Sequence, residues 1–171
     1  MSDALKAHFT RLFDYERKCS PLVMSSLRAS RAKIEEVGLA ALEAPHERAV
    51  EIFCHMQAAR RLWLSRIRPD LTAFPSDGVF PVWPVEQVEK EAQEVDELWE
   101  RYVSELSGTD LARPVRYSST EGVAYISTLS DILTHVINHS SYHRGQIASL
   151  VAKTGVRPAV TDFIALTREK A

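Results

Sequence analysis

The sequence predicts an all-α protein built as a bundle of four long helices. Four stretches each carry apolar residues at the i, i+3, i+4, i+7 spacing of an amphipathic helix. Prolines and glycines gather between these stretches, where they mark turns and loops. Helices with one apolar stripe each bury those stripes most economically against one another, which favours a four-helix bundle.

The first helix is expected over residues 3–28. The dipeptide Ser20-Pro21 lies within it, and proline removes a backbone donor and clashes with the preceding turn. A kink, or a restart capped by Ser20, is therefore expected there. Residues 32–44 fit either a short helix or a loop that covers the core. The inward residues of the first helix are Leu5, Phe9, Leu12, Phe13, Leu22, Val23 and Leu27.

The second helix is expected from about residue 45 to residue 67. His55 lies on its apolar inner face, whereas His8 and His46 lie near helix starts, where we expect them to be solvated. Residues 69–83 contain three prolines and a glycine and predict an ordered loop. The apolar residues that share the inner face with His55 are Ile52, Ala59 and Leu62.

The third helix opens at Trp83-Pro84, with proline near its first turn, and ends near Gly108. Its apolar residues alternate steps of three and four, and its glutamates fall off that seam, on a face that we expect to be solvated. The seam residues are Val85, Val88, Ala92, Val95, Trp99, Tyr102 and Leu106.

A small hairpin or irregular segment is expected before the last long helix. Residues 113–126 are too short and too rich in β-branched residues for another long helix, and they favour two short strands. Thr128 and Asp131 fit a capping box for the fourth helix, which runs to about Thr154. The tail over residues 158–166 predicts a short closing segment.

Composition excludes several classes of protein. The chain has 171 residues, 45% hydrophobic and 26% charged, which is ordinary for one globular domain over residues 1–171. A net charge of −2 without a long basic tract argues against nucleic-acid binding. Cys19 and Cys54 are too few for a disulfide framework and suit a reducing cytoplasm. We expect no signal peptide and no membrane span, because neither apolar pattern is present.

Half of the six histidines lie four residues apart on the fourth predicted helix: His135, His139 and His143. Imidazoles on an apolar stripe need hydrogen-bond partners or a metal ion, since burying an unpaired polar group costs roughly 1–3 kcal/mol. Residues i and i+4 can bind one ion, but His135 and His143 are about 12 Å apart along the axis and cannot. The pair is therefore His135 with His139 or His139 with His143, and a third ligand must come from another helix.

These residues lie in a wider pattern that resembles the DinB/YfiT-like family of metalloenzymes. The resemblance rests on residues 138–146, 12–15, 61–67 and 160–164, and it extends over nearly the whole chain. It implies a four-helix bundle with up-down-down-up connections, commonly a homodimer. Its metal triad, one histidine of the second helix and an HxxxH pair on the last, falls on His55, His139 and His143. Ser20-Pro21 departs from the family, in which many members have an asparagine in an unbroken helix.

On this resemblance His135 becomes a residue of the pocket beside the metal. Three neutral imidazoles suit one divalent ion per chain, Zn²⁺ or Ni²⁺ first and Fe²⁺ also, with water completing the ligand set. Cys54 points about 100° away from its neighbour on the helix and is expected to be a small core residue. Glycine within a helix costs roughly 1 kcal/mol against alanine, so Gly145 is expected to permit close approach of another helix.

The resemblance implies a thiol-dependent transferase or a hydrolase acting on a small molecule, in which a low-molecular-weight thiol takes part. The alternatives are a non-catalytic metal-binding protein of the stress response and a bundle whose histidines are merely packed. Candidate catalytic residues are Tyr142, Arg144 and His135, with Arg144 binding either an anionic substrate group or a partner carboxylate. Loops 69–83 and 113–126 are expected to shape the pocket. Further acid–base candidates are Glu51, which could also orient His55, and Asp131 and Asp162.

Overall fold

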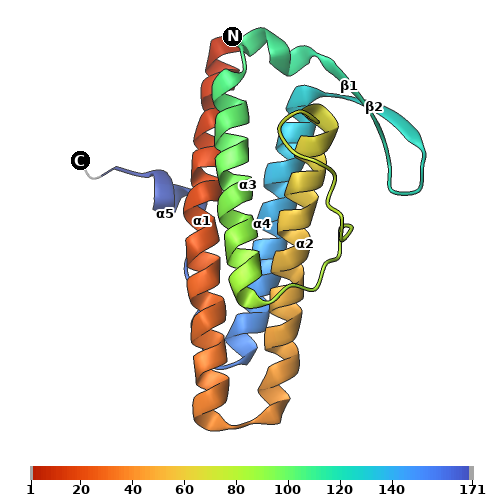
Figure 1. Ribbon diagram of the computed structural model, residues 1–171. Coiled ribbons are helices and arrows are strands. Elements are labelled where there is room, and N and C mark those ends of the chain that lie inside the picture. Colours follow the sequence, from red (N-terminus) through yellow and green to blue (C-terminus); the bar gives the residue numbers. More distant parts are fainter. Residues whose placement is uncertain (1, 170–171) are drawn as a thin grey trace.

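Four long helices lie side by side in the computed structural model, which describes residues 2–169 (Figure 1). This arrangement confirms the prediction of a mainly helical chain. None of the helices in the described part of the chain combines the length and the apolar character that crossing a bilayer requires. The four helices are α1 (Ser2–Val37), α2 (Glu43–Ile67), α3 (Val85–Glu105) and α4 (Leu129–Lys153).

Ion pairs between α2 and α3 show that these two helices run in the same direction. Arg60 pairs with Asp96 at 2.7 Å, and farther along both helices Arg68 pairs with Glu105 at 2.8 Å. Two parallel neighbours require a connection that returns along the bundle. Residues 68–84 make this crossover and follow the side of α2 (Figure 1).

The helix α1 continues through Pro21, so the predicted restart at Ser20 is wrong. Ser20 is buried within the helix and caps nothing, while Pro21 is exposed, so water can satisfy the carbonyl group that the missing N–H leaves free. The ambiguous segment after residue 32 belongs to α1 as far as Val37. Gly38 ends the helix there in a left-handed conformation, φ 66°, and donates its N–H to the Ile34 oxygen at 2.8 Å.

The core follows the predicted seam of α3. Trp99 is fully buried and stacks on Phe13 of α1, with 4.7 Å between the ring centroids. Aromatic stacking of this kind adds about 0.5–1.5 kcal/mol to the burial of the rings. The seam residues that the structure buries are Val88, Ala92, Val95, Trp99, Tyr102 and Leu106.

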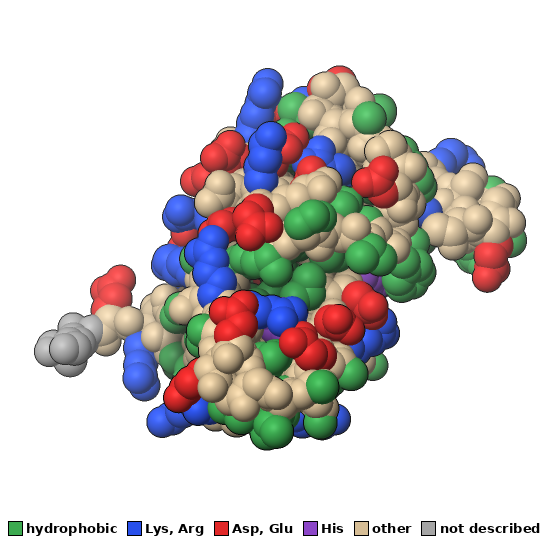
Figure 2. Space-filling model, turned by 60° about the horizontal axis from the view of Figure 1, so that its bottom comes forward, with side chains coloured by type: hydrophobic (Ala, Val, Ile, Leu, Met, Phe, Trp, Pro, Cys, Tyr) green, Lys and Arg blue, Asp and Glu red, His purple; other side chains and the backbone are tan. Residues whose placement is uncertain are grey.

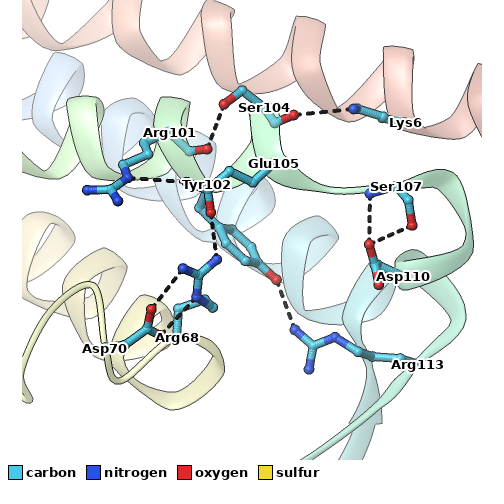
Figure 3. Close-up of polar contacts among 10 residues, drawn as sticks. All are labelled: Lys6, Arg68, Asp70, Arg101, Tyr102, Ser104, Glu105, Ser107, Asp110 and Arg113. Carbon is cyan, nitrogen blue, oxygen red and sulfur yellow. Dashed lines mark hydrogen bonds and ion pairs between the residues drawn. The ribbon is translucent and has the colours of Figure 1, made fainter.

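Polar side chains close the end of the bundle where α2 and α3 finish (Figure 3). Arg68 binds both Asp70 and Glu105 at 2.8 Å, which ties the start of the crossover to the last turn of α3. Tyr102 accepts a hydrogen bond from Arg113 at 3.2 Å, just before the first strand. This network fixes the chain at the point where it leaves the helices.

The predicted hairpin is present and precedes α4. Strand β1 (Pro114–Ser118) pairs antiparallel with β2 (Ala124–Thr128), and the hairpin projects from the bundle (Figure 1). The Thr128 hydroxyl accepts the N–H of Asp131 at 3.2 Å and so caps α4, as predicted. The tail forms the short helix α5 (Phe163–Thr167), which lies against α1.

His46 is buried rather than solvated, which corrects the prediction made for it. It is 1% exposed, and its Nδ1 lies 3.1 Å from the Ser30 hydroxyl of α1. The prediction failed because α1 extends beyond residue 28 and covers the first turn of α2. His8 is exposed, as expected.

Burial of His46 makes stability depend on pH. Desolvation, and secondarily the charge of Arg31, lowers the pKa of His46 below its ordinary value of 6.5. The unfolded chain therefore binds a proton that the folded chain resists, and stability falls as pH drops below about 6.5, by at most about 1.4 kcal/mol per pH unit. Urea unfolding at pH 7.5 and 5.5 measures this loss, which we expect to be smaller in the His46→Gln variant. The same loss in the variant would contradict the assignment.

Candidate metal centre

Three imidazoles from two helices meet near the middle of the bundle. His55 comes from α2, and His139 and His143 come from successive turns of α4. One nitrogen of each ring lies within 4.8 Å of a nitrogen of the other two. The Nε2 atoms of His139 and His143 are 3.1 Å apart. Of the two pairs that helix geometry left open, this is the one that the structure brings together with His55.

Hydrogen bonds on the outer side of the rings leave their inner nitrogens free. The Nδ1–H of His55 donates to the Val79 carbonyl oxygen at 2.5 Å, and the Nδ1–H of His143 donates to Oε1 of Gln146 at 2.8 Å. Each imidazole then keeps an unprotonated Nε2. Metal-binding histidines are generally held in this way, because the outer bond fixes the tautomer and the ring orientation.

The spacing and protonation of these nitrogens suit a divalent ion. Two nitrogens bound to one Zn²⁺ at about 2.05 Å in tetrahedral geometry lie roughly 3.3 Å apart, close to the separation found between His139 and His143. Burial, followed by the charges of His143 and His55, lowers the pKa of His139 to about 3. Its imidazole is therefore neutral at physiological pH, as a metal ligand must be. The three residues could hold one ion.

The crossover positions His55. Val79 accepts the hydrogen bond from the imidazole, and the ring of Phe80 stacks on it with 4.4 Å between centroids and 6° between planes. The sequence predicted an ordered loop here, but no local pattern in residues 69–83 indicates which carbonyl group or ring will reach α2. Sequence reasoning therefore missed both residues.

A pocket of about 440 Å³ opens beside His55 and His143. The crossover contributes apolar side chains to it, which agrees with the expectation for loop 69–83. The hairpin does not line this pocket; its Tyr117 instead contacts Trp63, at 5.0 Å between ring centroids, and Trp63 contacts His135. The expectation for residues 113–126 is wrong in this respect, because the hairpin lies against the last turns of α2, where Arg66 donates a hydrogen bond to the Ser118 oxygen at 2.6 Å.

Comparison with known proteins bears on this arrangement. The sequence model of the DinB family matches residues 32–170, which is most of the chain. The chain belongs to the DinB family. Over 84 residues it is 34% identical to Protein DinB of Bacillus subtilis (strain 168), a match that includes 46% of this chain and 49% of that protein. The chain thus spans about half the length of this relative. No solved structure gives a match.

In this DinB-family chain, Glu51 does not orient His55 as expected. Its carboxylate pairs with Arg48 at 2.8 Å, and Val79 holds the imidazole instead. The spacing of four residues brings Glu51 to the same side of α2 as His55. Arg48, three residues before Glu51, lies on that side too and forms an ion pair with its carboxylate. Cys54 is fully buried beside Trp83, which agrees with its expected role as a core residue.

The other carboxylate candidates lie at helix ends. Asp131 lies in the first turn of α4, two turns before His139, and its carboxylate accepts a hydrogen bond from the Thr128 hydroxyl at 2.7 Å. Asp162 is the residue immediately before α5, a helix that lies against α1. Neither belongs to the group of residues around the three imidazoles.

Tyr142 and His135 each lie next to one of the two imidazoles of α4. The ring of Tyr142 lies 5.2 Å from that of His143, and its hydroxyl accepts a hydrogen bond from Gln146 at 3.0 Å. His135 is exposed, and its ring centroid lies 5.6 Å from that of His139. Both positions permit a role in the pocket, and both roles stay predictions.

Arg144 faces α1 and not the imidazoles. Its guanidinium donates to both carboxylate oxygens of Glu16 at 2.7 Å and to the hydroxyls of Tyr15 and Ser141 at 2.8 and 2.9 Å. Of the two roles left open by the sequence, the structure shows the ion pair with a partner carboxylate. This pair fixes the rotation of α4 against α1 and thereby the direction in which His139 and His143 point.

Gly145 does not permit close approach of another helix, which corrects the prediction. A Cβ atom added there would meet nothing within 4 Å, and the residue is exposed. The prediction assumed that a costly helical glycine must serve packing. Here the residue lies on the solvent side of α4, and the structure provides no packing reason for it.

Proposed function

We propose that this protein binds one divalent metal ion through His55, His139 and His143 and acts as a metal-dependent transferase or hydrolase on a small molecule. The observation that carries the proposal is the meeting of three imidazoles from two helices, two of which form hydrogen bonds through Nδ1 on the side away from the others. Zn²⁺ and Ni²⁺ suit these ligands best, and Fe²⁺ also fits. A low-molecular-weight thiol is the proposed substrate or co-substrate, as in the family that the chain resembles.

An ion held by three neutral ligands retains its full charge and would favour the anionic form of a water or thiol at neutral pH. The chain supplies the surroundings. Val79 and Gln146 hold the Nδ1 protons of His55 and His143, which keeps both rings oriented. The crossover borders one side of the site with Phe80, Pro81 and Val82.

A second candidate function, a metal-binding protein of the stress response without turnover, is favoured by the hydrogen bonding of the acid–base candidates. Glu51 is paired with Arg48, and the Tyr142 hydroxyl is bonded to Gln146. Among the described residues, the group that could hold a metal contains histidines alone and no carboxylate. A catalyst needs a group that can move a proton near the reacting atoms. Because Glu51 and Tyr142 already bind other side chains, the structure favours metal binding without turnover in this respect.

The remaining features belong to the same proposal. We propose a cytoplasmic homodimer, each chain a single domain over residues 1–171 with the up-down-down-up helix order of the family. The proposal of a dimer rests on the family; the large apolar side chain of Trp63, which could have served an interface, packs against Tyr117 and His135 of the same chain.

Metal analysis followed by an activity screen tests the proposal. Protein stripped with a chelator and titrated with Zn²⁺ or Ni²⁺ is expected to bind one equivalent per chain. The loaded protein is then tested for thiol transfer to electrophilic acceptors and for ester hydrolysis, with stripped protein as the control. Turnover that depends on metal supports the enzyme, and metal binding without turnover supports the alternative. Absence of metal binding contradicts both.

A further inference from the structure

An apolar wall borders the pocket beside the imidazoles. Phe80, Pro81 and Val82 of the crossover form it together with Ile52 of α2, and His55 and His143 lie at the inner end. The volume of about 440 Å³ falls within the range of roughly 300–1,000 Å³ that is typical of small-molecule sites. The pocket therefore has the size and the lining of a site for an organic molecule larger than water.

Two side chains of this wall are largely exposed to water although they are apolar. Phe80 is 75% exposed and Val82 is 84% exposed. Neighbouring large apolar groups left in water commonly mark a binding site. Figure 2 shows hydrophobic side chains on one face of the molecule, with small areas of histidine between them.

Phe80 is held in place although it is exposed. One face of its ring stacks on His55, and the preceding Val79 is hydrogen-bonded to the same imidazole. The other face of the ring is left for a ligand. A rigid aromatic surface costs little entropy on binding, and it favours flat rings that can stack on it or meet it edge-on.

Charge at the outer rim is balanced. Arg48 and Glu51 both line the pocket, and they pair with each other at 2.8 Å. The rim therefore provides no unpaired charge that would favour a strongly charged body of the ligand. A neutral, flat group fits these surroundings better than a carboxylate or an ammonium group does.

We propose that the pocket selects substrates that carry a flat aromatic group next to the atom that approaches the metal, and that Phe80 and Val82 determine this preference. The proposal rests on the proposed metal site and names the substrate class for it. An aryl ring attached through one carbon to a thiol would place the ring against Phe80 while the sulfur lies at the inner end of the pocket.

Binding of two thiols to the zinc-loaded protein tests this inference. Phenylmethanethiol carries an aromatic ring and ethanethiol does not, while both present a thiol on a primary carbon. Calorimetric titration is expected to show phenylmethanethiol binding about tenfold tighter or more, since ring contacts and apolar burial together contribute at least about 1.4 kcal/mol. In the Phe80→Ala variant this preference is expected to fall to about twofold or less.

Phe74 provides a matched control. It lies in the same crossover and is 56% exposed, but it does not line the pocket. The Phe74→Ala variant is expected to keep the full preference. Zinc content is measured first for every variant. Should Phe80→Ala lose zinc because His55 is no longer held, Val82→Ala decides, since Val82 lines the pocket without stacking on the imidazole.

The outcomes separate this inference from the proposed function. Wild-type protein that takes up no zinc overturns the metal site before any thiol is added. Zinc-loaded wild-type protein that binds both thiols equally, or pocket variants that keep the full preference, overturn the substrate class alone. Light scattering that shows a dimer dissociating in the Phe80→Ala variant would assign the apolar wall to a second copy of the chain and overturn the inference as well.

Discussion

The His139→Ala variant is expected to lose the metal ion. His139 belongs to either pair that α4 could offer, and its Nε2 lies 3.1 Å from that of His143. Loss of a residue that merely orients a ligand costs 10–100-fold in metal affinity, so loss of a ligand is expected to cost at least roughly 100-fold. The affinity is measured by titration with Zn²⁺ against a competing chelator dye.

The His135→Ala variant is the control for this experiment. His135 is one turn away on the same helix and lies against Trp63, outside the group of three. We expect it to keep one equivalent of metal and to change substrate preference or rate. Full metal content in His139→Ala would contradict the site. Metal loss in His135→Ala with retention in His143→Ala would move the site one turn along α4.

The Glu16→Ala variant is expected to cost about 3–5 kcal/mol of unfolding free energy, the usual cost of leaving one partner of a buried ion pair alone. The side chains of Arg144 and Glu16 are 3% and 1% exposed, so water cannot replace the lost carboxylate. Urea unfolding followed by circular dichroism measures the loss. If the single variant does not fold, the double variant below supplies the comparison.

Asp14→Ala is the matched control, because Asp14 lies on the same helix and pairs with Arg17 at the surface. Exposed pairs contribute about 0–1 kcal/mol. Replacing both buried partners in Glu16→Leu/Arg144→Met is expected to restore most of the stability, since no charge is then left without its partner. Equal losses in Glu16→Ala and Asp14→Ala would contradict a structural role for the buried pair.

Much of the fold followed from periodicity, because burial of an apolar stripe decides where a helix lies. The seam residues of α3 are an example, and the N-cap of α4 at Thr128 also followed from the local sequence. Local rules failed where a distant segment decides the outcome. Pro21 is tolerated because its face of α1 is exposed, and His46 is buried because α1 is longer than its clearest pattern indicated.

The candidate site was predictable only in part from the residues themselves. The spacing of His139 and His143 shows that one helix can offer two ligands, but it does not show which helix lies opposite. The resemblance to the family supplied His55. The hydrogen-bond partners of the rings also differ in how far the sequence predicts them. Gln146 lies within the helix motif, three residues after His143. Val79 reaches His55 through a crossover whose path no short sequence pattern indicates.

The crossover also constrains the order in which the protein folds. Individual helices form within about a microsecond, but contacts between segments distant in sequence wait for the chain to close large loops. His55 meets His139 only after α2 and α4 have docked, and its ring is oriented only once residues 68–84 have run back along the bundle. The three nitrogens therefore come together late. A metal ion would therefore bind only after most of the bundle has formed. It would slow unfolding more than it accelerates folding.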